Sequence, residues 1–251
     1  MKTFKDTEYG DQSGQTYTEH ITLDCDIESL DGAPNVVKGE FNCNSCKLLE
    51  TLKHSPKIVE GDFHCGWCDG LEDLTGSPEI VKGDYICNSC ENLSSLKGAP
   101  KVVEESFNAN ICEKLKDLKG SPEIVKGKFN CAVCENLETL DGSPERVGSF
   151  ECSWCPKLIN LKGSPEIVGD VFECISCDKL ETVEGAPRKC KKFDCRFCPK
   201  LKNLDHLLKC DIDKIIADKH LLDDFKKKKA IIEKYGFERA MEVFETIDEL
   251  I

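Results

Sequence analysis

Hydrophobic residues recur along this chain in one pattern with a period of 22 residues. Each unit follows the consensus G-[AS]-P-x-x-V-x-G-x-F-x-C-x-x-C-x-x-L-x-x-L. The prolines of this pattern stand 21 or 22 residues apart, at Pro34, Pro56, Pro78, Pro100, Pro122, Pro144, Pro165 and Pro187. Self-similarity at a fixed period is typical of architectures in which each unit packs against its neighbours.

Within each unit, the F-x-C segment predicts a short β-strand. Its alternation places the Phe and the first Cys on the inward side, and the Gly and the G-[AS]-P motif mark the turns. One unit cannot bury its Phe, Val and two Leu alone, whereas stacked units can, with their strands in a parallel sheet along one face. About nine strands at a spacing of about 4.8 Å give a sheet roughly 40 Å long. We therefore expect a repeat solenoid with a parallel β-sheet and short turns.

The two ends of the chain depart from the repeat. Residues 1–19 are polar and are expected to form a loose N-terminal segment or a small cap, and residues 20–204 to form the solenoid of about nine repeats. In residues 205–251 one last strand is expected near Cys210, and the apolar spacing then becomes helical, with Gly236 dividing two helices. Because a terminal unit leaves a core edge uncovered, we expect these helices to form a C-terminal cap.

The repeat combines the L-x-x-L spacing with two alternating inward residues and with a polar or Cys residue that recurs in every unit. This combination resembles the leucine-rich repeat family. Phe and the first Cys resemble the inward residues of that family's strand. The second Cys of each unit matches the family's Asn/Cys ladder position: Cys46, Cys68, Cys90, Cys112, Cys134, Cys155, Cys177 and Cys198. The short G-[AS]-P turn departs from the family, since it leaves little room for a helix. Compact arrays of this kind also resemble proteins of bacteriophages and large DNA viruses, which implies a phage-encoded protein directed at a host protein.

The composition indicates the cellular compartment and the redox state of the cysteines. The chain has 251 residues, 18 cysteines and a formal charge of −13. No run approaches the roughly 18 apolar residues of a membrane span, and the N-terminus lacks the apolar region of a secretory signal. We therefore expect a cytoplasmic protein, in the host cell if it is viral, with its cysteines reduced. The acidic balance disfavours electrostatic binding to nucleic acid or to a membrane.

Seven C-x-x-C pairs are the strongest chemical signal in the chain. They are Cys43 and Cys46, Cys65 and Cys68, Cys87 and Cys90, Cys131 and Cys134, Cys152 and Cys155, Cys174 and Cys177, and Cys195 and Cys198. Their local spacing is a zinc pattern, which an iron–sulfur cluster or cross-repeat disulfides could also use. The repeat favours a buried thiol ladder instead, because Cys packs as a small hydrophobe and Ala109 replaces one ligand. We expect no cofactor, and the metal alternative stays open.

No other motif indicates catalysis. The five histidines are scattered, and the chain has no H-E-x-x-H, Walker, G-x-S-x-G or G-x-G-x-x-G motif. A thioredoxin-like role needs an exposed thiolate with a lowered pKa, which a buried strand does not offer. We therefore expect the protein not to be an enzyme.

The variable positions of the repeat predict a binding surface. Residues that flank the inward Phe and Cys point outward, and the residue before the second Cys ranges from Ser to Trp. A fixed framework with a variable face suits recognition, with aromatic side chains as anchors. The candidate partner-binding residues are Asp62, His64, Trp67, Asp84, Glu151, Trp154, Glu173 and Phe197. The alternative is that these side chains only cover the rim of the sheet.

Three functional hypotheses follow from these observations. The favoured one is a non-enzymatic module that binds another protein, without a nucleic-acid, membrane or small-molecule partner. Residues 1–204 carry 25 basic and 35 acidic side chains, a net charge of −10, which supports a mimic of nucleic acid that occupies a DNA- or RNA-binding protein. The third hypothesis is a zinc-binding structural protein.

Overall fold

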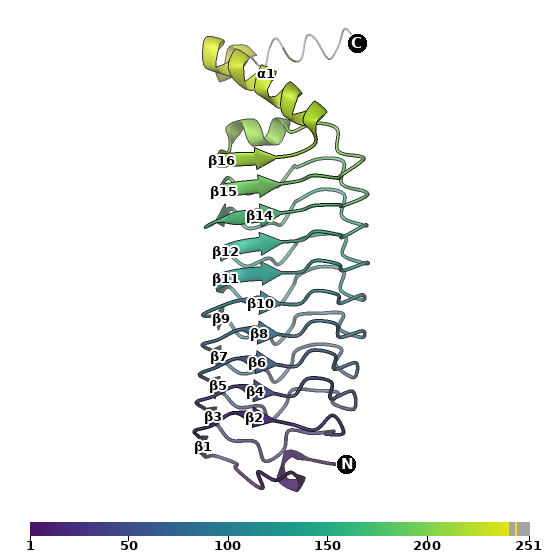
Figure 1. Cartoon of the computed structure of the whole chain (residues 1–251), viewed down its shortest axis with the longest axis vertical. Helices are drawn as coiled ribbons and strands as arrows, with labels where there is room; N and C mark the ends of the chain where they lie inside the picture. The colour runs from purple at the N-terminus through teal and green to yellow at the C-terminus, as the bar shows by residue number, and fades with distance from the viewer. Residues whose placement is uncertain (241–243, 245–251) are drawn as a thin grey trace.

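The computed structural model describes residues 1–240 and 244, and it shows stacked coils that form a parallel β-solenoid (Figure 1). Neighbouring coils pair in register, so Phe63 lies beside Tyr85 and Tyr85 beside Phe107. Every pairing between strands in the described part of the chain is parallel. The predicted fold class, a parallel solenoid of short repeats followed by a helix, is therefore confirmed.

Most coils contribute two short strands, where the sequence predicts one. The strands that hold the inward Phe, or Ile21 or Tyr85 in its place, are here called the Phe ladder. They are β2 (Ile21–Thr22), β4 (Phe41–Asn42), β6 (Phe63–His64), β8 (Tyr85–Ile86), β10 (Phe107–Asn108) and β14 (Val171–Glu173). The strands around the repeat's Val, here called the Val ladder, are β1 (Thr16–Tyr17), β3 (Val36–Val37), β5 (Ile58–Val59), β7 (Ile80–Val81), β9 (Val102–Val103) and β13 (Ile167–Val168). Four longer strands span both ladders: β11 (Ile124–Asn130), β12 (Arg146–Glu151), β15 (Lys189–Asp194) and β16 (Asp211–Ile216). Figure 1 shows the Phe ladder facing the viewer and the Val ladder along the left edge.

The core consists of columns of equivalent side chains. From Phe41 to Phe193, one aromatic ring per coil stacks on the next, with centroids 5.0–5.7 Å apart and planes within 25° of each other. Columns of Leu, Val and Cys lie beside the rings and are equally buried. Each coil leaves half of this apolar surface for its neighbour to cover, so the units are stable only as a stack.

The first residues of the chain cover the N-terminal end of the core. Phe4, in the short 3₁₀-helix η1 (Phe4–Asp6), is fully buried, and its ring lies 6.4 Å from that of Phe41. Tyr17 then pairs with Val37 as the first strand of the Val ladder. This segment therefore takes the place that a preceding coil would occupy.

The C-terminal end is covered by a helix. After the 3₁₀-helix η2 (Asp205–Lys209), β16 extends the sheet to Ile216, and α1 (Lys219–Tyr235) crosses the end of the solenoid (Figure 1). The α1 side chains Leu221 and Phe225 are buried. Gly236 ends α1 with a φ of 83°.

Residues 237–240 are helical again, as expected after Gly236. Met241, Ile247 and Leu250, which continue the helical apolar spacing in the sequence, lie outside the described residues. Within the described ranges, no helix has the length and apolar character needed to cross a bilayer.

Candidate interaction surface

A few residues after the inward aromatic residue of each complete coil, the chain turns through one residue in the left-handed conformation. This residue always precedes the second Cys of the repeat, and its φ lies between 54° and 61° in all eight complete coils. The eight residues are Ser45, Trp67, Ser89, Ile111, Val133, Trp154, Ser176 and Phe197. We call them the corner column.

Main-chain and thiol hydrogen bonds hold this turn. The amide N–H of Trp67 donates to the carbonyl oxygen of Asn88 in the next coil (2.9 Å), and Trp154 donates likewise to Ile175 (2.8 Å). The thiol of the second Cys donates to the preceding coil, as from Cys68 Sγ to the carbonyl of Cys43 (3.1 Å). Because these bonds use no corner side chain, the turn does not dictate which residue stands there.

Five members of the corner column are large and apolar, and all five are exposed. The exposed fractions are 48% for Trp67, 41% for Ile111, 39% for Val133, 60% for Trp154 and 62% for Phe197. A left-handed backbone is unfavourable for any residue with a Cβ, and most of all for bulky and β-branched residues. The corner column therefore places partly solvated apolar side chains on strained backbone, at a position where Gly would carry no strain. Backbone strain of this kind is typical of functional sites.

The structure divides the eight predicted partner-binding residues into three groups. Trp67, Trp154 and Phe197 lie on the corner column. His64 lies on the outward face of β6, and Asp62 and Asp84 stand directly before β6 and β8. Glu151 and Glu173 lie on the same face several coils further on. The residues thus share one side of the solenoid without converging on one point.

The acidic residues near β6 have a structural partner in the main chain. Asp62 Oδ1 accepts the amide N–H of Asp84 (2.8 Å), and Asp84 Oδ1 accepts that of Ser106 (2.8 Å). His64 Nε2 lies 3.6 Å from Glu40 Oε1 and 3.9 Å from Asp62 Oδ2. Asp62 and Asp84 therefore help to join successive coils, and their side chains are only partly free for a partner.

The later carboxylates belong to an ion-pair network. Glu151 pairs with Lys128, and Glu173 lies 3.8 Å from Lys128 and 3.3 Å from Lys192. Next to them, Asp194 is fully buried and accepts two hydrogen bonds of 2.9 Å from Arg196. Burial opposes the ionisation of Asp194, but the hydrogen bonds from Arg196 and Lys192 outweigh it and lower the pKa of this carboxyl.

Sequence reasoning missed two members of the apolar set, Ile111 and Val133. Both occupy the variable position before the second Cys, but an aliphatic residue between buried neighbours resembles core in a sequence. Their exposure follows from the left-handed turn, which no local pattern encodes. The only available signal was that this position is either Ser or a large apolar residue in every complete coil.

The paired cysteines form the predicted thiol ladder. The fifteen cysteines at the two repeat positions are buried and unlinked, in two columns that run along the solenoid. Burial raises the pKa of Cys90 and of Cys134 to about 12, so both thiols stay protonated and can donate hydrogen bonds. Among residues 1–240 and 244, no group of three or more His, Cys, Asp or Glu side chains is arranged to hold a metal ion.

Fold and surface together define a class of protein, a parallel β-solenoid of 22-residue coils with a buried thiol ladder and a C-terminal helix. Comparison with protein-family models, curated proteins and solved structures finds no match to this chain.

Proposed function

We propose that the protein is a non-enzymatic binding module that holds a protein partner on its corner column. The observation that supports this most strongly is the set of five exposed apolar side chains on left-handed backbone. Folding alone favours Gly or a small polar residue at this position, because the main chain and the thiols already form the turn. Contact with a partner supplies the missing reason for large side chains.

The geometry of the column suits an elongated contact. Trp67 and Trp154 stand four coils apart, about 19 Å at the usual strand spacing, and Phe197 stands two coils beyond Trp154. Trp anchors dominate many interfaces, and a rigid backbone lowers the entropic cost of ordering them on binding. The mixed ion pairs of the neighbouring Phe ladder would form a polar flank beside these anchors.

The resemblance of the repeat extends this proposal to origin and location. Arrays of this kind resemble proteins of bacteriophages and large DNA viruses, which makes a host protein the expected partner. The proposed compartment is the host cytoplasm, where the unlinked thiols of the core stay reduced.

The proposal is tested by removing the anchors while relaxing the backbone. The variant Trp67→Gly/Trp154→Gly/Phe197→Gly should lose partner capture from a host-cell lysate and should still unfold cooperatively. The variant Leu48→Ala/Ile159→Ala is the matched control, because Leu48 and Ile159 are equally exposed but lie outside the corner column. Capture that is equal in wild type and in the glycine variant would remove the corner column from the binding surface.

Two further measurements separate this proposal from its alternatives. A nucleic-acid mimic requires free carboxylates, so its binding should weaken steeply with salt and compete with DNA. Capture on apolar anchors should depend little on salt. A zinc protein would hold at least one zinc ion per chain after purification, which elemental analysis detects.

A further inference from the structure

A row of carboxylates lies beside the first part of the corner column. Each member stands two residues after a corner residue, in four consecutive coils: Asp69, Glu91, Glu113 and Glu135. We call them the acidic row. Lys47 holds the same position in the preceding coil, and its Nζ lies 2.9 Å from Asp69 Oδ2. This ion pair shows that side chains at this position meet between neighbouring coils.

The like charges of the acidic row are unfavourable for the fold, because carboxylates on neighbouring coils repel each other. Beside the Val ladder the chain avoids this repulsion, since the residue after the repeat's Pro alternates in sign over four coils: Lys57, Glu79, Lys101 and Glu123. The acidic row has no such alternation. Among residues 1–240 and 244, no basic side chain pairs with Glu91, Glu113 or Glu135, and all three are exposed. Folding alone would favour a lysine in every second coil of this row.

A hollow with an acidic lining adjoins the acidic row at its Trp67 end. Its volume is about 540 Å³, and its lining residues are Glu50, Gly70, Glu72, Asp73 and Asn92. Asp73 Oδ1 accepts the amide N–H of Thr75 (2.8 Å), whereas no described basic side chain pairs with Glu50 or Glu72. The hollow therefore offers space and two carboxylates to a positively charged side chain, close in sequence to the anchor Trp67.

We propose that the protein segment held on the corner column is basic. Its apolar residues cover Trp67, Ile111 and Val133, and its lysine or arginine side chains face the acidic row and the hollow. This inference rests on the proposed function, because it names the chemistry of the partner bound there. Opposite charges beside an apolar contact speed association and reject acidic partners. They also offset the repulsion within the acidic row.

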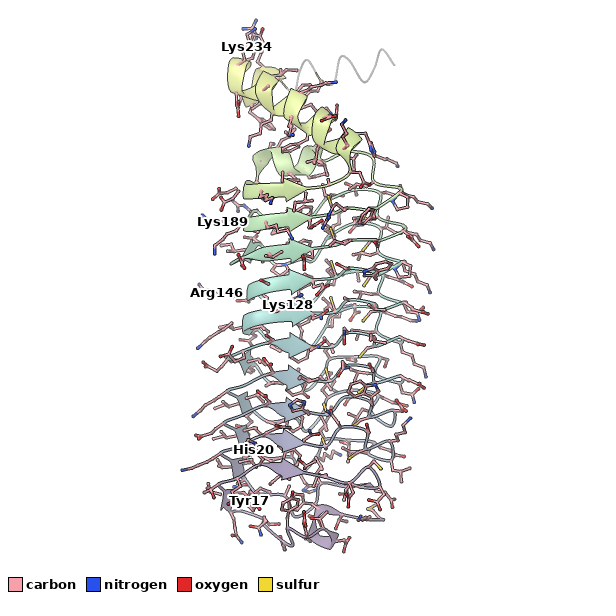
Figure 2. The ribbon with its side chains drawn as sticks, viewed as in Figure 1. Tyr17, His20, Lys128, Arg146, Lys189 and Lys234 are labelled. Carbon is pink, nitrogen blue, oxygen red and sulfur yellow. The ribbon has the colours of Figure 1, made fainter. Side chains whose placement is uncertain are left out.

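The later coils confine the basic part of the partner to one end of the corner column. On the Phe ladder, Glu151 is paired with Lys128, which Figure 2 labels, and Glu173 is paired with Lys192. In the last three complete coils the position of the acidic row holds Pro156, Asp178 and Pro199, and an exposed lysine follows each: Lys157, Lys179 and Lys200. The surface around Trp154 and Phe197 therefore lacks the excess of negative charge that surrounds Trp67.

Fluorescence anisotropy with the full chain and two designed peptides tests this inference. Each peptide is an amphipathic helix of about 19 residues, which matches the roughly 29 Å from Trp67 to Phe197. In the lysine peptide the apolar face is Leu throughout, and the polar positions are Lys in one half and Ser in the other. The second peptide has Glu in place of Lys. Wild type should bind the lysine peptide at least about tenfold more tightly than the glutamate peptide.

Neutral variants then locate the charges that matter. Glu91→Gln/Glu113→Gln/Glu135→Gln should weaken binding of the lysine peptide about fivefold, and Glu50→Gln/Glu72→Gln, in the hollow, about threefold. A change of this size stays well below the steep loss with salt expected of a nucleic-acid mimic.

The variant Glu79→Gln/Glu145→Gln/Glu166→Gln is the matched control. It removes the same number of exposed carboxylates as the acidic-row variant, but each of them stands directly before a strand of the Val ladder. Glu145 precedes Arg146, which Figure 2 labels on the left edge of the solenoid. The control should bind the lysine peptide as tightly as wild type.

Four results would overturn the inference. They are a wild type that does not bind the lysine peptide, equal affinity for the two peptides, an unchanged affinity in the acidic-row variant, and equal weakening by the acidic-row and control variants. The glycine variant of Trp67, Trp154 and Phe197 separates this failure from that of the proposed function. If only the glycine variant loses binding, the basic partner is rejected and the corner column remains. If the glycine variant binds the lysine peptide as tightly as wild type, the corner column is rejected as well.

Discussion

At the scale of single residues, each coil contains two left-handed positions that are filled by opposite rules. The first, in the G-[AS]-P turn, is Gly in nearly every coil, because a Cβ at Gly98 would lie 2.5 Å from the carbonyl oxygen of Leu74. The second, before the second Cys, is never Gly. Contact with the backbone of the neighbouring coil explains why the first position is Gly, whereas the proposed partner contact would explain the large side chains at the second position.

The turn position gives a prediction with a natural control. Gly98→Ala should destabilise the protein by about 2 kcal/mol or more, because it adds a clash to a φ of +93°. His54 occupies the equivalent position in another coil with a φ of 70°, so His54→Gly should leave the stability unchanged or raise it by up to about 1 kcal/mol. Urea unfolding measures both, and equal effects of the two substitutions would contradict the argument.

Tyr85 supplies a second prediction at this scale. It replaces Phe in the aromatic column, and its buried hydroxyl donates to Ser77 Oγ (2.7 Å), which itself donates to the carbonyl of Leu74 (2.8 Å). Ser77→Ala should cost about 1–3 kcal/mol, because it leaves the Tyr85 hydroxyl without its acceptor. Together with Tyr85→Phe the same substitution should cost much less, since Phe and Ala occur at these positions in other coils. A double-mutant cycle without coupling would reject this account.

At the scale of the elements, the sequence predicts one strand of the coil and misses the other. The Phe strand is visible because Phe and Cys alternate with outward residues beside clear turn signals. The Val strand is equally short in most coils, but its inward Val is not followed two positions later by a second hydrophobic residue, so no alternation can be recognised. Its amide groups bond to the preceding coil, as from Ile80 N–H to the carbonyl of Lys57 (3.2 Å), so its conformation depends on stacking.

The thiol columns make the stability of the solenoid sensitive to alkaline pH. An unfolded thiol ionises near its ordinary pKa of 9.0, whereas burial holds the pKa of Cys90 and Cys134 at about 12. Between these two pH values the folded chain binds more protons than the unfolded chain. The contribution of the thiols to stability is therefore fully present below pH 9 and is lost as the pH rises toward 12. Within this pH window, each such thiol lowers the free energy of unfolding by about 1.4 kcal/mol per pH unit.

Thermal unfolding under reducing conditions checks this prediction. The melting temperature should be constant from pH 7 to about 8.5 and should fall steeply above pH 9, because many thiols act together. Cys131→Ala should make the fall shallower, and Ala109 shows that Ala is accommodated at this position of the repeat. A melting temperature that is the same at pH 8 and pH 10 would contradict the role of the buried thiols.

At the scale of the whole molecule, the periodicity of the sequence predicts that the coils stack. Which side chains come together on the surface depends on contacts between coils. Trp67, Trp154 and Phe197 could be selected as candidates because large residues are conspicuous at a variable position. Their common line along the solenoid follows from the register of the coils. The ion pairs of Glu151 and Glu173 depend on Lys128 and Lys192 in other coils, so they became visible only in the folded chain.

The most direct test of the central claim is the affinity of the captured partner for wild type and for Trp67→Gly/Trp154→Gly/Phe197→Gly. If the corner column is the binding surface, the dissociation constant should rise at least about thirtyfold in the glycine variant while its melting curve stays cooperative. Replacing the same residues with Ala should weaken binding equally but give a less stable protein, because Ala keeps the left-handed strain. An unchanged dissociation constant in a folded glycine variant would contradict the account.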